Sequence, residues 1–306
     1  MRALLVVNRQ ATTTSERSRD VLVGALRSVA DVEVAHTRRR GHGSALAREA
    51  AEAGVGLVVT LGGDGTVNEV VNGLMAVGAD ATQRPALAVV PGGSTNVFAR
   101  ALGLPPDWAE ATGVILAALR QERYRTINLG RADHRYFTFC AGLGLDAAVI
   151  RRVERARWRG RSAGPVAYLR TTVGQFFLHS ERGHPSITVE VPGEVVSRVA
   201  TVVVQNTAPW TYLFDRPIDL NPDASFELGL DVLAIDALKV ATTVWTAGQM
   251  LLGRGPRGRR LRRWHDLPKL TVRAQRPQPF QLDGDYLGER REVEFVSVPQ
   301  ALRVLC

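Results

Sequence analysis

The sequence contains little cysteine, little lysine and no long apolar run. Its 306 residues include only two cysteines, Cys140 and Cys306, whereas a disulfide scaffold depends on a denser set. No apolar stretch approaches the roughly 18 residues that suggest a membrane-spanning helix, and the apolar run after Met1 is too short for a secretory signal. These absences predict a cytoplasmic protein that is held together by burial and meets membranes only peripherally.

Positively charged residues outnumber negatively charged ones. The chain has 39 Lys and Arg against 30 Asp and Glu, a net charge of +9, which invites a nucleic acid or an anionic membrane surface as partner. Lysine occurs only at Lys239 and Lys269, and the chain is rich in Ala, Gly and Val, a skew that coding bias also produces. Because nucleic-acid binding would rest on charge alone, we expect none.

The pattern of elements changes along the chain. Strands expected at 4–7, 32–36, 56–61 and 86–90 alternate with helices expected at 15–30, 44–53, 66–77, 95–102 and 109–120, which predicts a mostly parallel sheet covered on both faces. Further strands are expected at 136–140, 186–191, 199–205, 230–235, 270–273 and 292–298, with helices at 149–155, 164–178 and 238–252. We therefore expect an α/β domain over residues 1–125 and a largely antiparallel β domain over 126–298. A terminal strand within 299–306 would be free to return to the first domain.

The most informative segment is Gly62-Gly63-Asp64-Gly65-Thr66, between an expected buried strand and an expected helix. Glycines there would permit positive φ and a close approach to a ligand, and the first N–H groups of the helix form an anion site. Asp64 would repel a phosphate unless a divalent cation lay between them. The loop thus predicts a metal–nucleotide phosphate complex. The alternative is a tight turn in which Asp64 or Thr66 caps a helix.

A second loop, residues 91–96, has the same setting. It reads Pro-Gly-Gly-Ser-Thr-Asn after a strand-like run and before a helical one. Two such loops on neighbouring strands would bring two helix N-termini to one carboxyl edge of the sheet, where open α/β sheets bind ligands. The pair is neither a Walker A sequence nor the dinucleotide-binding fingerprint.

The paired loops resemble the diacylglycerol kinase catalytic domain family, which includes bacterial soluble lipid kinases and sphingosine kinases. The motifs that carry the resemblance are Gly62-Gly63-Asp64-Gly65-Thr66-x-Asn68-Glu69 and Pro91-x-Gly93-Ser94-x-Asn96-x-Phe98-Ala99-Arg100. Weaker matches lie before the loops at Asn8 and Thr37, and after them, in family order, at 142–146, 222–224, 229–232 and 282–285. The resemblance therefore covers nearly the whole chain.

The resemblance implies an ATP-dependent lipid kinase that uses Mg²⁺. It implies a Rossmann-like, NAD kinase-like α/β domain and a C-terminal β-sandwich domain, with the nucleotide in the cleft between them. The expected nucleotide contacts are Asn8, Thr37, Gly62, Gly63, Asp64, Gly65, Thr66, Asn68, Glu69, Gly93, Ser94 and Asn96. Leu228 occupies the position where the family has an aspartate. Whether this chain keeps the family's accessory magnesium site is therefore an open question.

Two acids in Leu282-Asp283-Gly284-Asp285 are candidates for the chemistry. Across a glycine turn both carboxylates can converge on one site, whereas the alternative is a hairpin tip with solvated acids. In the family the motif is Leu-Asp-Gly-Glu, and its acids serve as base or metal ligand. We assign Asp283 and Asp285 jointly to catalysis with Asp64, and expect Asp64 and Asp283 to hold the metal. By resemblance to sphingosine kinases, Asp146 would orient the acceptor head group, unless it is a turn or cap residue.

Several alternatives stay open. The superfamily resemblance also allows an NAD kinase-like or other small-molecule hydroxyl kinase, or a catalytically weakened protein that binds lipid or nucleotide. The identity of the lipid and a homodimer are left open. Arginines cluster around Trp158, over 151–161, and ahead of Trp264, over 254–263. Such clusters either dock the second domain on anionic membrane or are ordinary solvated charge.

Overall fold

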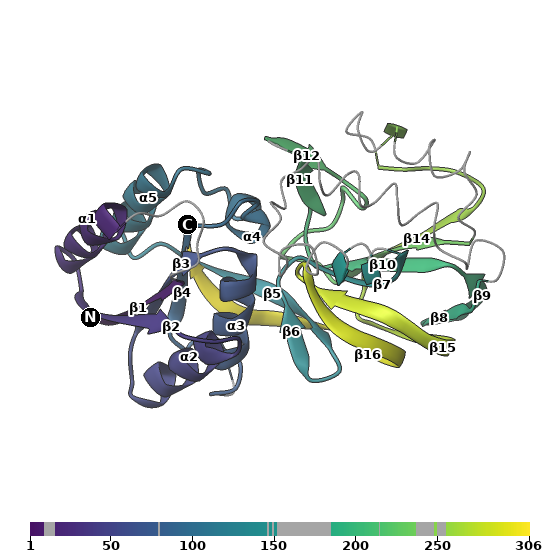
Figure 1. Ribbon diagram of the computed structural model, residues 1–306, viewed down its shortest axis with the longest axis horizontal. Helices are drawn as coiled ribbons and strands as arrows, with labels where there is room; N and C mark the ends of the chain where they lie inside the picture. The colour runs from purple at the N-terminus through teal and green to yellow at the C-terminus, as the bar shows by residue number, and fades with distance from the viewer. Residues whose placement is uncertain are drawn as a thin grey trace. The chain divides into compact units, whose positions relative to one another are not determined.

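The computed structural model describes residues 1–8, 16–78, 80–145, 147–148, 150–151, 185–213, 215–236, 248–249 and 255–306 (Figure 1). It divides the chain into two compact units. Unit 1 comprises Met1–Leu129 and Pro299–Cys306, and unit 2 comprises Gly130–Val298. The chain passes from one unit to the other within β5 (Tyr124–Ala132) and within β16 (Asp285–Leu305). The helices expected at 149–155, 164–178 and 238–252 lie mainly outside the described residues.

Unit 1 is built on a parallel sheet. Its strands are β1 (Arg2–Asn8), β2 (Asp31–Thr37), β3 (Leu57–Gly62) and β4 (Ala86–Pro91), in the order β2-β1-β3-β4. The last residues of β16 add a further parallel strand, with Val304 opposite Leu87. Every residue of β3 and β4 is buried, because helices cover both faces of a parallel sheet and its central strands are apolar throughout.

Five described helices belong to unit 1: α1 (Glu16–Arg27), α2 (His42–Glu52), α3 (Asp64–Leu74), α4 (Val97–Ala101) and α5 (Trp108–Arg120). Helices α1 and α5 lie on one face of the sheet, and α2 and α3 lie on the other (Figure 1). Gly73 lets α3 approach α2, since a Cβ at that position would lie 2.2 Å from the Ser44 carbonyl oxygen. The layers are those of a Rossmann-like domain.

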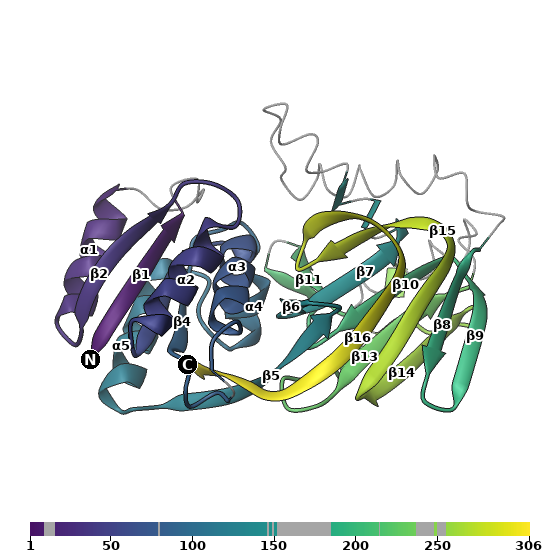
Figure 2. The same ribbon diagram turned by 90° about the horizontal axis from the view of Figure 1, so that it is seen from below.

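Unit 2 consists of antiparallel strands. They are β6 (Arg135–Phe137), β7 (Cys140–Gly144), β8 (Ile187–Val191), β9 (Glu194–Val199), β10 (Thr201–Gln205), β13 (Leu230–Ile235), β14 (Leu261–Leu267) and β15 (Lys269–Leu282), with a separate pair β11 (Thr211–Leu213) and β12 (Arg216–Ile218). Strand β15 pairs with β8 along its first half and with β7 along its last residues (Figure 2). These pairings bring buried apolar residues of β7, β8 and β15 into one core cluster.

Alternating side chains fill the core of unit 2. Val202 and Val204 of β10 point into it, as do Val189 of β8 and Val272 of β15, because successive side chains of a strand face opposite sides. The expected class, an α/β domain followed by a β-sandwich domain, is confirmed. Among the described residues, no helix is both long enough and apolar enough to cross a membrane.

Candidate functional site

The carboxyl ends of the parallel strands gather the expected phosphate-binding residues along one edge of unit 1. Asn8 lies opposite Thr37 in the register of β1 and β2, and Gly62 lies opposite Pro91 in that of β3 and β4. The Asn8 side-chain amide donates a hydrogen bond of 3.1 Å to the Thr66 hydroxyl. The structure thus brings the ends of β1 and β2 and both glycine loops to the same edge, as expected for a ligand site in this fold.

The two glycine loops pack directly against each other. The Gly92 N–H donates to the Gly62 carbonyl at 2.9 Å, and a Cβ added to Gly93 would lie 2.6 Å from the Gly63 Cα. The expectation of positive φ was wrong: Gly63 has φ −90°, and neither it nor Gly62, Gly92 or Gly93 is among the described glycines with positive φ. Glycine is required here because one loop's backbone touches the other's.

Asp64 joins the loops through its side chain. One carboxylate oxygen accepts the Val97 N–H and the other accepts the Phe98 N–H, both at 3.1 Å. Asp64 therefore caps α4, the helix after the second loop, so the first N–H groups of that helix donate to the protein. A role of Asp64 as metal ligand stays a prediction.

Asn96 closes the second loop. Its side-chain oxygen accepts the Gly93 N–H and its amide donates to the Gly93 carbonyl, both at 2.8 Å. Asn68 is 1% exposed and binds Asn72 one helical turn later. Ser94, by contrast, is exposed at the loop tip. Asn96 thus shapes the second loop and Asn68 is engaged within α3, whereas the contact of Ser94 with a nucleotide stays a prediction.

Helix α3 opens on the first loop. Gly63, its N-cap residue, has no side chain with which to cap the helix. The N–H groups of Thr66 and Val67 already donate to the Gly63 carbonyl at 2.9 and 3.2 Å. The start of this eleven-residue helix carries the positive end of the helix dipole, which favours an anion such as phosphate.

Glu69 acts on the neighbouring helix. Its two carboxylate oxygens accept the N–H groups of Gly41 at 2.6 Å and of Gly43 at 2.9 Å. Gly41 is the N-cap residue of α2 and offers no side-chain cap of its own. Glu69, expected among the nucleotide contacts, therefore supplies the missing cap of α2 from α3.

The structure places Asp283 and Asp285, which were assigned jointly, in different surroundings. Asp283 is 3% exposed, and its carboxylate accepts four hydrogen bonds of 2.7 to 3.1 Å, from the backbone N–H and hydroxyl of Thr138 and the N–H groups of Phe139 and Cys140. A carboxylate has about four lone-pair sites, so these donors fill them. Asp283 thus anchors a hairpin, and protein donors occupy the oxygens that a base or a metal ligand would use.

Asp285 lies in a different setting. Asp283 and Gly284 form a two-residue turn with φ of 47° and 79°, the positive values that a type I′ hairpin requires. Asp285, opposite Leu282 at the start of β16, is half-buried. Of the two acids, Asp285 is the one that remains at the surface, and its catalytic role stays a prediction.

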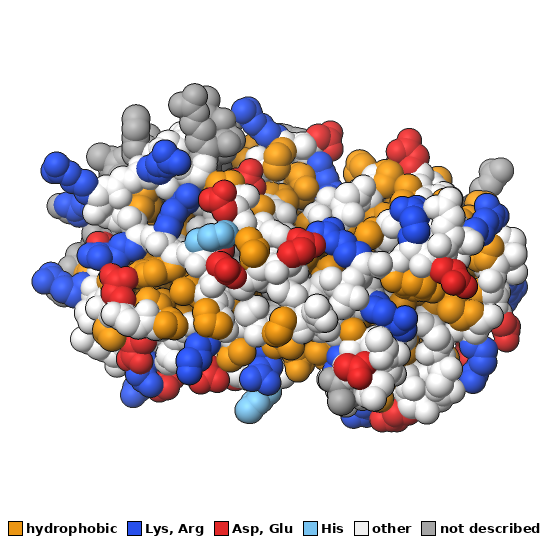
Figure 3. All heavy atoms as spheres, turned by 180° about the vertical axis from the view of Figure 1, so that it is seen from behind, with side chains coloured by type: hydrophobic (Ala, Val, Ile, Leu, Met, Phe, Trp, Pro, Cys, Tyr) orange, Lys and Arg blue, Asp and Glu red, His pale blue; other side chains and the backbone are white. Residues whose placement is uncertain are grey.

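The other predicted residues of unit 2 divide in two. Asp146, Trp158 and most of their flanking arginines lie outside the described residues. In the second cluster, the Trp264 indole N–H donates to Glu194 at 2.8 Å, and Arg263 donates to the Leu220 carbonyl. On the face drawn in Figure 3, basic side chains are interspersed with acidic ones over the described surface. Arg262 pairs with Asp236 at 3.4 Å and with Glu194 at 3.9 Å. Trp264, Arg263 and Arg262 are therefore engaged by the protein, and membrane contact by this cluster stays a prediction.

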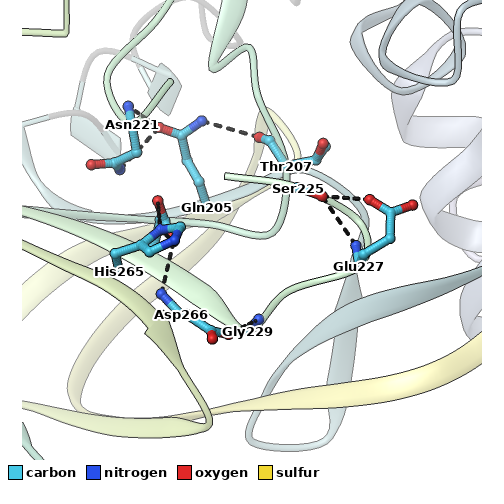
Figure 4. Close-up of polar contacts among 9 residues, drawn as sticks. Gln205, Thr207, Asn221, Ser225, Glu227, Gly229, His265 and Asp266 are labelled. Atoms are coloured by element: carbon cyan, nitrogen blue, oxygen red, sulfur yellow. Dashed lines mark hydrogen bonds and ion pairs between the residues drawn. The ribbon is translucent and has the colours of Figure 1, made fainter. Parts of the chain in front are cut away.

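A polar network occupies the segment around Leu228. The Gln205 side-chain oxygen accepts two 3.1 Å hydrogen bonds from Asn221 (Figure 4). His265 Nδ1 lies 2.8 and 3.0 Å from the two carboxylate oxygens of Asp231. The hydrogen bond to this buried carboxylate raises the pKa of His265. Sequence reasoning missed the pair, because only the register of β13 and β14 brings its members together.

Asp231 lies in the segment where the resemblance places the family's accessory magnesium site. Asp231 also accepts the Asp266 N–H at 3.1 Å, so protein donors meet its carboxylate. Among the described residues, no group of three or more His, Cys, Asp or Glu side chains is arranged to hold a metal ion. Mg²⁺ is commonly held by only one or two carboxylates together with substrate phosphates.

Comparison with known proteins shows to which family the two glycine loops belong. The diacylglycerol kinase catalytic domain matches residues 2–132, which contain both glycine loops. The chain belongs to the diacylglycerol kinase catalytic domain family. A diacylglycerol kinase of Staphylococcus saprophyticus is 32% identical over 216 residues, which cover 71% of this chain and 66% of that protein.

Other members of the family match over different lengths. The diacylglycerol kinase of Bacillus subtilis is 28% identical over 278 residues, covering 87% of this chain and 82% of the relative. A probable lipid kinase YegS-like of Chromohalobacter salexigens is 44% identical over 109 residues, but this match covers 36% of this chain and 33% of that protein. The names of these relatives support a lipid kinase.

Solved structures show the same fold. A diacylglycerol kinase from Bacillus anthracis has a TM-score of 0.73 over 99% of this chain and 96% of its own, at 20% identity. An NAD kinase from Archaeoglobus fulgidus, in complex with ATP, has a TM-score of 0.55 over 99% of this chain and 93% of its own, at 12% identity. Both share the α/β domain and the β domain that follows it.

Proposed function

We propose that this member of the diacylglycerol kinase family transfers the terminal phosphate of ATP to the hydroxyl group of a lipid. The observation that carries the proposal is the pair of interlocked glycine loops at the carboxyl edge of unit 1, within residues 2–132 that match the family's catalytic domain. An acceptor like diacylglycerol is the first choice, because several relatives bear that name. A sphingoid base is the second.

Unit 1 would bind the donor. The start of α3, free of a cap from Gly63, favours the phosphates, and Asn8, Thr37 and Ser94 add polar groups at the same edge. Phosphoryl transfer asks a protein mainly for positioning and charge stabilisation, which rigid loops provide. Bound Mg²⁺ would neutralise charge on the phosphates, and Asp64 is the acid in the loop that would hold it.

Unit 2 would supply the base. Asp285 stands where the family has glutamate and is half-buried, whereas Asp283 is engaged by four donors. In this proposal Asp285 accepts the proton of the lipid hydroxyl while the hydroxyl oxygen bonds to the γ-phosphorus of ATP. The bond from that phosphorus to ADP breaks, and ADP leaves. A base that forms such a contact contributes typically 10² to 10⁴ in rate.

The acceptor would be met at a membrane surface. A lipid hydroxyl lies at the head-group level, so the protein must touch the bilayer peripherally, and anionic lipid would attract its net charge of +9. Sedimentation with vesicles should then show binding that rises with acidic lipid and weakens with salt. Binding indifferent to both would remove the electrostatic part of the proposal.

The experiment that tests the function uses γ-labelled ATP with diacylglycerol, a sphingoid base, phosphatidylglycerol and NAD as separate acceptors, resolved by thin-layer chromatography. Label in a lipid supports the proposal and names the lipid. Label in NAD alone would replace the lipid kinase with an NAD kinase-like enzyme. ATP binding without any labelled product would indicate a binding protein that has lost catalysis.

A further inference from the structure

The loop between β2 and α2 carries an unusual concentration of charge. Three consecutive arginines, Arg38, Arg39 and Arg40, follow Thr37, the last residue of β2. We call residues 38–43 the basic loop. Because Thr37 lies opposite Asn8 in the parallel register, the basic loop starts from the same carboxyl edge as the two glycine loops.

The backbone of the basic loop is fixed at several points. The Arg38 N–H donates to the His42 ring at 3.1 Å, and the His42 N–H donates to the Arg39 carbonyl at 3.1 Å. Gly41 adopts φ 80°, a left-handed conformation that glycine accepts without strain. From α3, Glu69 accepts the N–H groups of Gly41 and Gly43. The loop is thus tied to the helix that begins at the first glycine loop.

The side chains of Arg38 and Arg39 make no polar contact with the described part of the chain. Both are exposed, and neither guanidinium forms a hydrogen bond or ion pair with any residue that the structure describes. Arg84, by contrast, donates to three backbone carbonyls. A rigid backbone that presents two unengaged cations is preorganised for an anion, because little ordering remains to be done on binding.

We propose that the basic loop is a subsite for the phosphate chain of the nucleotide donor, in which Arg38 and Arg39 contact phosphate oxygens. The proposal rests on the proposed function. Arginine suits this ligand, since its planar fork pairs with phosphate oxygens bidentately. Strands β2 and β3 are separated by β1, hence by roughly 10 Å, a gap that an arginine side chain and a polyphosphate together can span.

Glu69 is the positioning residue of this subsite. Both its oxygens are directed at backbone N–H groups of the basic loop, and among the described residues it forms no ion pair with the arginines. Its carboxylate therefore holds the loop without neutralising the charge that the loop presents.

The test compares affinities for ATP, ADP and adenosine, measured by calorimetry on the full chain at one ionic strength. The double variant Arg38→Ala/Arg39→Ala should weaken ATP binding about tenfold or more, since hydrogen bonds to charged groups are each worth more than neutral ones. The loss should shrink for ADP and vanish for adenosine. The matched control, Arg27→Ala/Arg120→Ala, removes two exposed arginines at the ends of α1 and α5 and should leave all three affinities unchanged.

Several outcomes would overturn the inference. Unchanged ATP affinity in the double variant, or an equal loss for adenosine, would remove the phosphate contact. Loss of binding to phosphatidylglycerol vesicles with ATP affinity intact would assign the arginines to the membrane instead. A wild-type protein that binds no nucleotide would end the proposed function as well, and so differs from a failure of this subsite alone.

Glu69→Gln tests the anchor separately. The amide retains one acceptor and turns an NH₂ group toward the other N–H, so hydrogen exchange at Gly41 and Gly43 should accelerate. ATP affinity should fall while adenosine affinity and the thermal unfolding midpoint stay near those of the wild type. Faster exchange with unchanged ATP affinity would contradict the positioning role.

Discussion

At the scale of single residues, the acids of the site differ in what surrounds them. Asp64 and Glu69 each accept two backbone N–H groups, and Asp283 accepts four donors. Residue type and position marked Asp64 and Asp283 as candidates, and the family resemblance added Glu69. Spacing could not separate Asp283 from Asp285, because residues two apart share a face of a strand. Positive φ at Asp283 and Gly284 turns the first acid into the core.

Substitution of Asp283 should lower stability, whereas substitution of Asp285 should lower turnover. Asp283→Asn places an NH₂ group against buried donors, and the free energy of unfolding should fall by about 3 kcal/mol. Asp285→Asn should leave that free energy near the wild-type value and lower turnover about a hundredfold or more. Chemical denaturation and steady-state kinetics measure the two effects. An Asp283→Asn variant as stable as the wild type would contradict the structural role of Asp283. A fully active Asp285→Asn variant would contradict the catalytic role of Asp285.

The His265–Asp231 pair should make stability depend on pH. The folded protein raises the pKa of His265 above its ordinary value of about 6.5. The stabilisation is therefore fully present below pH 6.5 and is lost as pH rises through the raised pKa. His265 is 51% exposed on its side chain, so solvent screening keeps the effect modest. His265→Gln should abolish the decline in denaturant midpoint across that window, and the exposed control His134→Gln should preserve it.

At the scale of elements, the periodicity of the sequence was informative wherever strands and helices alternate. The expected strands at 56–61 and 86–90 correspond to β3 and β4, because buried parallel strands are written as apolar runs. Strand β14 was missed: its residues 261–267 are mostly charged or polar, and their pairing with β13 is a tertiary property. The interlocking of the glycine loops was also beyond reach, since only the folded sheet shows which backbones touch.

The glycine loops should tolerate no side chain where they touch. Gly93→Ala would place a Cβ 2.6 Å from the Gly63 Cα, and such overpacking costs about 1–3 kcal/mol. We expect lower stability together with a loss of nucleotide affinity. The control Gly113→Ala, in the open interior of α5 with no atom within 4 Å of its Cβ, should stabilise by about 0.5–1 kcal/mol. A Gly93→Ala protein as stable and as tight-binding as the wild type would contradict the described contact between the loops.

At the scale of the whole molecule, the order of elements predicted an α/β unit followed by a β unit. The boundary lies within β5, between Leu129 and Gly130, rather than after residue 125. It could not be read from the sequence, because β5 continues across it without a turn signal. The identity of the acceptor is likewise not written in any motif, since many lipids present a hydroxyl beside apolar chains.

The central claim is direct transfer of phosphate from ATP to a lipid hydroxyl. It is tested most directly with ATP whose γ-phosphoryl oxygens carry ¹⁸O, incubated with the protein and mixed vesicles that contain diacylglycerol, followed by mass spectrometry of the extracted lipids. The account predicts a phosphorylated lipid that retains the labelled oxygens, formed by the wild type and about a hundredfold or more slowly by Asp285→Asn. Labelled inorganic phosphate without any phosphorylated lipid would contradict it.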